Sequence, residues 1–401
     1  MEVRSDPEVV GLFGRLTAVF AVAATGLAVV SGAADWGTTH SVLAAVALPP
    51  LAALAIIAWI SARRLFSGAI FALATFGLAA LLTTKSVHLA AASVAFAAAV
   101  YVCALSFRTA RDSSHGSVSD YVELTKPRVM SLLLLTGAAA TFVGADGVPR
   151  ASIFVLTMVG LALACGGSGA LNHYLDRDID PLMGERTAAR PVAAGRVSPE
   201  SALEFGLALS ALSWVLLDAL VNLPTATLAL AGNLFYVFVY TRWLKRSTHQ
   251  NIVIGGAAGA VPPLVGYAGT SGHIGWAAIV MFLIVFIWTP PHFWALALMI
   301  KEHYAAANVP MLPVAKGDEE TTRQIVRYSW VMLGLTLVPV AFGVFGLVYG
   351  GLALLLGGVF MVYALRLRRD PIRERAVSLF HYSMIYLALL FVAMAIDVVI
   401  L

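Results

Sequence analysis

Apolar runs long enough to cross a bilayer recur along the whole chain, and they limit its fold more than any other feature. A helix needs about 20 apolar residues to span the hydrocarbon core, and thirteen segments of this kind can be marked in the 401 residues. Only 12% of the residues are charged, against about 25% in a typical soluble domain. Because the bilayer core offers no partners for free backbone groups, the sequence predicts an all-α polytopic membrane protein.

The thirteen segments form two groups, separated by a polar stretch at 108–128. Four segments precede this stretch, near 11–33, 41–61, 66–83 and 87–107. Nine follow it, near 129–145, 151–174, 200–221, 223–241, 250–269, 275–299, 325–345, 347–365 and 378–400. We therefore expect a four-helix transmembrane extension over 1–110 and a nine-helix domain over 111–401.

The Lys and Arg residues predict how these helices are oriented. If the chain is threaded through thirteen helices from a cytoplasmic N-terminus, only Lys85 and Arg150 of the 26 fall on the outer side. Three polar loops, at 175–199, 242–249 and 300–324, then face the cytoplasm. The net charge is +4, and the sequence has no dense tract of Lys and Arg, which argues against a nucleic-acid partner. We expect a multi-pass plasma-membrane protein with its chemistry on the cytoplasmic side.

The stretch LNHYLDRDID places several carboxylates at the end of an apolar segment. Asn172, Asp176 and Asp180 are spaced i, i+4 and i+8, so a continuous helix would place them on one face, with Asp178 pointing away. Ionisable side chains near bilayer depth are costly and usually functional, and carboxylate and amide oxygens suit Mg²⁺. The alternative is a charged helix end that meets water, with Arg177 pairing locally.

Basic residues follow at once, in GERTAARPVAAGRVSP, which carries Arg186, Arg190 and Arg196. Carboxylates that can hold a metal, next to arginines that can hold an anion, indicate a metal–diphosphate site. Each cation taken alone could equally be a topology-determining charge.

Together these residues resemble a known family. NHYLDRDIDPLMGERTAARPVAAGRVS is similar to the NxxxDxxxD motif of the UbiA superfamily of intramembrane prenyltransferases. WTPPHFWALAL, at 288–298, resembles its haem-modifying branch, the protohaem IX farnesyltransferases. Further strings similar to that branch are DYVELTKPRVMSLLLLTG, YTRWLKRSTHQNIVIGGAAGAVPPLVGYAG and NVPMLPVAKG, so that the resemblance extends over about 120–401.

The resemblance implies a nine-helix bundle that transfers a farnesyl group from farnesyl diphosphate to a vinyl group of haem B, giving haem O. Mg²⁺ would assist ionisation of the diphosphate, and the vinyl group would attack the resulting carbocation. Asn172, Asp176 and Asp180 would be the catalytic and metal-binding residues. The cations implied for the diphosphate are Lys126, Arg128, Arg186, Arg190, Lys245, Arg246 and Lys301, with Lys126, Arg190, Lys245 and Lys301 as first choices.

The WTPPHFW string supplies the residues expected to bind haem, namely Trp288, His292, Phe293 and Trp294. Their rings offer flat apolar surface, and the imidazole could contact the iron or a propionate. The other reading of His292 is a core histidine that bonds a carbonyl freed by the tandem prolines.

One segment departs from the family pattern. The haem branch usually has an aspartate just before the tyrosine of KEHYAAANVPMLP, and here that position is His303, preceded by Glu302. A shift of one residue rotates a side chain about 100° around a helix. Either Glu302 replaces the ligand, or His303 takes part, or the second metal site is weakened.

Two other functions stay open. The first is a UbiA-type prenyltransferase with a quinone or lipid precursor as acceptor. The second is a non-catalytic haem-binding or transport protein. The extension at 1–110 is either a packed bundle or a docking surface for a haem-pathway partner such as haem A synthase.

Overall fold

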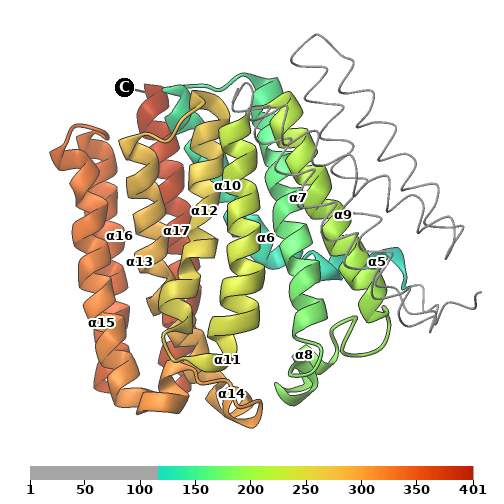
Figure 1. Cartoon of the computed structure of the whole chain (residues 1–401). Coiled ribbons are helices and arrows are strands. Elements are labelled where there is room, and N and C mark those ends of the chain that lie inside the picture. The colour runs from blue at the N-terminus through green and yellow to red at the C-terminus, as the bar shows by residue number, and fades with distance from the viewer. Residues whose placement is uncertain (1–115, 401) are drawn as a thin grey trace, which may run out of the picture.

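The computed structural model describes residues 116–400, and the four apolar segments expected between 11 and 107 lie outside the described residues. Every regular element in the described part is helical, and nine of its helices are long and apolar enough to cross a membrane (Figure 1). The predicted all-α membrane fold with a nine-helix bundle is therefore confirmed for this part of the chain.

The spanning helices run in chain order through the bundle, and each matches one predicted segment. They are α6 (Pro127–Ala145), α7 (Ala151–Leu175), α9 (Pro199–Leu220), α10 with its continuations (Leu223–Ser247), α12 (Asn251–Ser271), α13 (Trp276–Met299), α15 (Leu312–Ala341), α16 (Leu347–Arg369) and α17 (Arg373–Ile400). The continuation of α10 consists of a π-helix, η2 (Phe235–Leu244), and the short α11 (Lys245–Ser247). The other short helices are α5 (Val118–Leu124), η1 (Asp180–Leu182), α8 (Glu185–Ala188) and α14 (Lys301–Ala306).

Helix starts follow local sequence rules. Pro127 and Pro199 occupy the first turns of α6 and α9, where a missing N–H costs nothing. The Ser198 hydroxyl accepts the N–H of Ser201 and caps α9. These signals determine where the helices begin. The short helices α8, α11 and α14 lie together at one end of the bundle (Figure 1).

The small-residue stretch 255–266 of α12 serves close packing. A Cβ added to Gly266 would lie 2.0 Å from the carbonyl oxygen of Gly137 on α6. One added to Gly255 would lie 2.3 Å from the ring of Tyr240. Only glycine lets the backbones of α6 and α12 approach this closely, so α12 lies in the middle of the bundle.

Two predicted loops were wrong. The segment 242–249 was expected to be a polar loop, but it is helical as far as Ser247, because η2 runs to Leu244 and α11 follows. The segment 300–324 was expected to be a polar loop, but α14 occupies 301–306 and α15 already begins at Leu312. Leu312 and Pro313 are buried and anchor this early start against the bundle. Gly317, with φ of +82°, interrupts the helical geometry of α15 one turn after its start, a conformation that favours glycine.

The fold makes a prediction about sidedness. In a chain whose two cysteines, Cys103 and Cys165, are changed to serine, we would introduce a single cysteine at Val148 or at Glu185. The residues precede and follow the single spanning helix α7. A membrane-impermeant maleimide should label them from opposite faces of sealed vesicles. Labelling of both from the same face would contradict the fold.

Candidate functional site

The motif residues converge at the end of α7. Asn172 lies in its last turn, Asp176 caps it, and Asp180 begins η1. The helix stops at Leu175, so the predicted continuous helical face ends there, but the N–H of Asp180 donates to the carbonyl of Asp176 at 2.8 Å and keeps a four-residue turn. The three residues are buried, with exposed fractions of 3%, 0% and 1%.

Three of the seven predicted cations meet these residues. Lys245 Nζ lies 2.5 Å from Asp176 Oδ2, and Arg190 Nη1 lies 2.6 Å from Asp180 Oδ1. Lys126 Nζ donates to Asn172 Oδ1. Three cations thus surround two buried carboxylates, a balance that favours an added anion.

Asn172 joins the parts of this cluster. Its Nδ2 donates to Asp176 Oδ2 at 2.9 Å and to the hydroxyl of Thr241 at 3.1 Å. Thr241 belongs to the π-helix η2, and Lys245 is the first residue after η2 ends at Leu244. The wider i→i+5 turn of a π-helix changes the direction of the side chains that follow, and such turns are frequent at functional sites. Here Thr241 and Lys245, which both come from this segment, contact Asn172 and Asp176 at the end of α7.

Lys126 is held in an unusual backbone conformation. Its φ of +55° is left-handed, and it directly precedes Pro127. Such strain is costly for a non-glycine residue and persists where the surroundings demand it. Burial, and secondly the nearby Arg190, lower the pKa of the Lys126 amine to about 7. An anion bound beside it would favour the protonated form.

The donor set fits a divalent cation of the Mg²⁺ type. Asp176 Oδ1 and Asp180 Oδ2 are buried oxygens without a hydrogen bond. Burial raises the pKa of the Asp180 carboxyl against the opposing effect of Arg190, which a bound cation would counter. Mg²⁺ needs only one or two protein carboxylates when phosphate and water fill its other positions. Within 116–400 no three or more His, Cys, Asp or Glu side chains are grouped for a metal, so Asp176 and Asp180 are the carboxylates that this site offers.

Arg246, predicted to bind the diphosphate, makes its main contacts elsewhere. It forms a double contact with Asp178, at 2.6 and 2.7 Å, and donates to the carbonyl of Leu175 at 2.7 Å. Asp178, which we expected to have no role, therefore ties η2 and α11 to the end of α7. The pKa of its carboxyl falls to about 2, chiefly through the hydrogen bonds from Arg246. Arg246 remains within 3.8 Å of Asp176 Oδ1.

The other three predicted cations lie outside the cluster. Arg128 and Arg186 are exposed. Lys301 pairs with Asp318 at 2.7 Å and fastens α14 to α15. The structure thus brings together Lys126, Arg190 and Lys245. The other predicted cations are exposed or form ion pairs that join helices.

Glu302 and His303 both lie on α14 with exposed side chains, and the structure does not join them to Asp176 and Asp180 in one metal cluster. The two residues differ in their contacts. A Cβ on Gly184 would lie 3.0 to 3.2 Å from three atoms of the His303 ring, so His303 lies over the loop that follows Asp180.

His292 has the surroundings of a core histidine. Its Nδ1 lies 2.6 Å from the Ser383 hydroxyl, and its ring stacks between Trp288 and Phe380 at 4.3 and 4.6 Å. Trp288 Nε1 donates to the Ser383 carbonyl at 2.9 Å. Two of the four predicted haem-binding residues therefore pack α13 against α17. This favours a core histidine, but its partner is the Ser383 hydroxyl and not the freed carbonyl that was expected.

Phe293 faces the motif loop instead. It packs against a cluster that includes Ile179, Met183, Tyr304 and Met311. Burial raises the pKa of the Tyr304 hydroxyl to about 12. The sequence interpretation missed this apolar lining and Thr241. The apolar residues at 304–312, inside what we took for a polar loop, were the available signal.

The comparisons with known proteins agree with this geometry. The model of the UbiA prenyltransferase family matches residues 133–393. The chain belongs to the UbiA prenyltransferase family. A protohaem IX farnesyltransferase of Symbiobacterium thermophilum is 50% identical over 296 residues, which cover 73% of this chain and 99% of that protein. Two Roseiflexus proteins of the same name are 51% and 50% identical over 280 residues, 70% of this chain, and the chain spans about half of their length, 52%.

Solved structures show the same fold at low identity. A structure of digeranylgeranylglyceryl phosphate synthase matches with a TM-score of 0.59 at 18% identity, covering 71% of this chain and 99% of that one. A UbiA homologue from Archaeoglobus fulgidus, bound to GPP and Mg²⁺, matches with a TM-score of 0.52 at 18% identity, covering 70% and 100%. The nine-helix bundle is thus the UbiA fold.

The buried pair predicts a specific stability pattern. Lys245→Met leaves the Asp176 carboxylate without its closest cation and should destabilise the protein by about 3–5 kcal/mol. The double variant Lys245→Met/Asp176→Asn should recover part of this loss, because no buried charge is stranded. Thermal unfolding in detergent measures both, with Lys301→Met as the control. Lys301 pairs with Asp318 in a partly exposed contact that is worth about 1 kcal/mol or less. A single Lys245 variant as stable as the parent would contradict the assignment.

Proposed function

We propose that this protein transfers the farnesyl group of farnesyl diphosphate to a vinyl group of haem B and so forms haem O. The buried cluster of Lys126, Arg190 and Lys245 around Asp176 and Asp180 supports a prenyl diphosphate as donor. The acceptor is inferred from relatives of about 50% identity that carry the name protohaem IX farnesyltransferase. The implied pathway is the supply of haem O and haem A to terminal oxidases.

The first step breaks the allylic C–O bond and leaves pyrophosphate. Lys126, Lys245 and Arg190 are placed to stabilise the charge that develops on this leaving group, because their amines and guanidinium surround the carboxylates. Mg²⁺, held by Asp176 and Asp180 with Asn172 beside them, would supply further positive charge to the diphosphate oxygens. Burial strengthens each of these interactions by excluding water.

The second step joins the farnesyl carbon to the acceptor. The vinyl π electrons form the new C–C bond, water adds to the resulting cation beside the porphyrin ring, and one proton leaves. Phe293 and Tyr240, at the motif loop, offer aromatic faces that stabilise cationic character and exclude stray water. Their place next to Ile179 and Met183 supports a prenyl path that ends at the aspartates.

The surroundings of this reaction are also proposals. We infer that the protein lies in the plasma membrane with the motif end of the bundle facing the cytoplasm, on the basis of its Lys and Arg distribution. We further propose that residues 1–110 form a separate extension and 111–401 the catalytic domain, and that haem A synthase receives the product.

The assignment predicts unequal roles for two neighbouring carboxylates. Asp176→Asn should lower the conversion of haem B to haem O by about 100-fold or more, because it removes a buried charge at the reacting diphosphate. Asp178→Asn should lower it less than about fivefold, because Asp178 makes an exposed pair. Purified protein, farnesyl diphosphate and haem B are incubated, and haem O is measured by mass spectrometry. Equal losses would contradict the assignment.

The same assay separates the acceptors. Prenylation of a quinone or lipid precursor without any conversion of haem B would support the alternative enzyme. Binding of haem B without consumption of farnesyl diphosphate would support a haem-binding or transport protein. Either outcome would overturn the proposed reaction.

The altered second motif predicts a metal effect. His303→Asp places a carboxylate over the loop that follows Asp180, so the Mg²⁺ concentration for half-maximal rate should fall. Glu302→Gln is the matched control and should leave it unchanged, because the three atoms closest to a Cβ on Gly184 in that loop all belong to His303. The rate is measured across a Mg²⁺ titration. An unchanged dependence in His303→Asp would show that this position does not reach the metal.

A further inference from the structure

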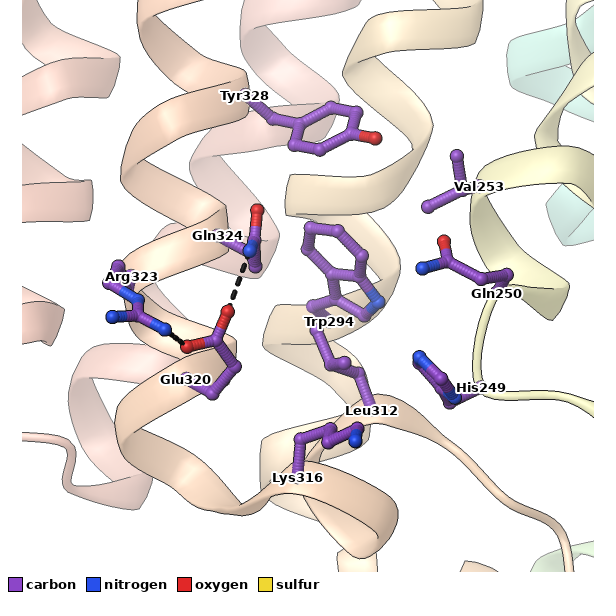
Figure 2. Close-up of a pocket in the computed structure, with 10 residues that line it drawn as sticks. All are labelled: His249, Gln250, Val253, Trp294, Leu312, Lys316, Glu320, Arg323, Gln324 and Tyr328. Atoms are coloured by element: carbon purple, nitrogen blue, oxygen red, sulfur yellow. Dashed lines mark hydrogen bonds and ion pairs between the residues drawn. The ribbon is translucent and has the colours of Figure 1, made fainter.

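A pocket opens at the same end of the bundle, between the start of α12, the end of α13 and the start of α15 (Figure 2). Its volume of about 490 Å³ lies in the range of small-molecule sites, which is about 300–1,000 Å³. Its walls include His249, Gln250, Trp294, Lys316 and Tyr328. None of these residues takes part in the cluster around Asp176.

Trp294 gives the pocket an unmet hydrogen bond. The residue is 2% exposed, and its Nε1–H has no partner within the described part of the chain. Leaving a buried donor unpaired costs about 1–3 kcal/mol. The indole nitrogen lies on the side of the ring that faces His249 and Gln250 (Figure 2). A ligand with an acceptor atom would satisfy it there.

The charges of the pocket favour an anion. Its only carboxylate among the described lining residues, Glu320, is already occupied, since it pairs with Arg323 and accepts from Gln324 at 2.6 Å. Lys316 has no carboxylate partner among residues 116–400. The exposed Lys316 ammonium and the buried Trp294 N–H would therefore both bind a ligand that has anionic oxygens.

The polarity of the pocket lining also changes along α15. Lys316 lies near the start of α15, and Tyr328 lies twelve residues further along the same spanning helix. Val253 lines the wall across from it on α12 (Figure 2). Basic pockets between helices at the cytoplasmic end of a membrane protein are typical sites for anionic lipid headgroups, with aromatic residues at the interface.

The pocket and the candidate active site lie on different sides of the same two helices. On α12, Ile252 packs with the motif loop while the next residue, Val253, lines the pocket. On α13, Phe293 packs with the motif loop while Trp294 lines the pocket. Successive residues on a helix point about 100° apart, which explains the division. An occupant of the pocket would stabilise the helix ends that form the wall of the active site.

We propose that this pocket binds the phosphate headgroup of an anionic phospholipid, with Lys316 and the Trp294 indole N–H as its principal contacts. The proposal goes beyond the prenyl-transfer reaction and does not depend on it.

Binding of short-chain lipids to the full chain tests the proposal. The purified protein in neutral detergent is titrated calorimetrically with dihexanoyl phosphatidylglycerol and, separately, with dihexanoyl phosphatidylcholine. Only the anionic lipid should bind with measurable affinity. Lys316→Gln should weaken its binding about fivefold, the effect of one basic residue near a membrane surface. Trp294→Phe should also weaken it, because the ring remains and the N–H is lost.

The matched control is the double variant Arg368→Gln/Arg369→Gln, which removes two exposed cations from the same end of the bundle without changing the pocket. Its affinity should equal that of the parent. Equal binding of both lipids, or no effect of Lys316→Gln, would overturn the proposal. So would displacement of the lipid by inorganic phosphate at similar concentration, which would indicate a free-phosphate site. Displacement by haem B, lost in Lys316→Gln, would instead identify a site for the carboxylates of haem.

Discussion

The contact between Lys245 and Asp176, 2.5 Å long and almost wholly buried, is the interaction on which the rest of the site depends. Two charges removed from water recover their desolvation cost only if geometry and further hydrogen bonds are good. Asn172 supplies one of those bonds to Asp176, and Lys126 holds Asn172 from the other side. The left-handed Lys126 and the π-helix before Lys245 are both unfavourable locally. They are explained if the function requires several buried cations at one point.

Much of the bundle follows from hydropathy, because length and apolar content suffice to identify a spanning helix. All nine predicted spans in the described part are present, and α15 alone begins much earlier than expected. Its early start rests on the burial of Leu312 and Pro313 against other helices. A tertiary contact of this kind leaves no periodic signal in a short segment that reads as polar.

The site was only partly predictable for the same reason. Spacing correctly placed Asn172, Asp176 and Asp180 together, since a helical turn relates them. It could not show which cations turn inward, because that depends on the packing of η2 and α11. Arg246 and Lys245 are adjacent in the chain, yet one pairs with an exposed carboxylate and the other with a buried one. His292 likewise takes its role from Ser383, which lies 91 residues away.

The ends of α12 and α13 connect the two candidate sites. Side chains on one side of these helices pack with the motif loop, and their immediate neighbours line the pocket beside Lys316. If the pocket binds a lipid headgroup as proposed, these shared helices would connect the membrane surface to the reaction site. At this end of α12, Gly255 packs closely against the ring of Tyr240 on η2.

The most direct measurement is a structure of the purified protein with Mg²⁺ and a non-hydrolysable farnesyl diphosphate analogue. The account predicts metal density at the free oxygens of Asp176 and Asp180, with the diphosphate in contact with Lys126, Arg190 and Lys245 and the prenyl chain leading past Phe293. A diphosphate bound elsewhere, with the Lys245–Asp176 pair unchanged and no metal beside it, would contradict the account.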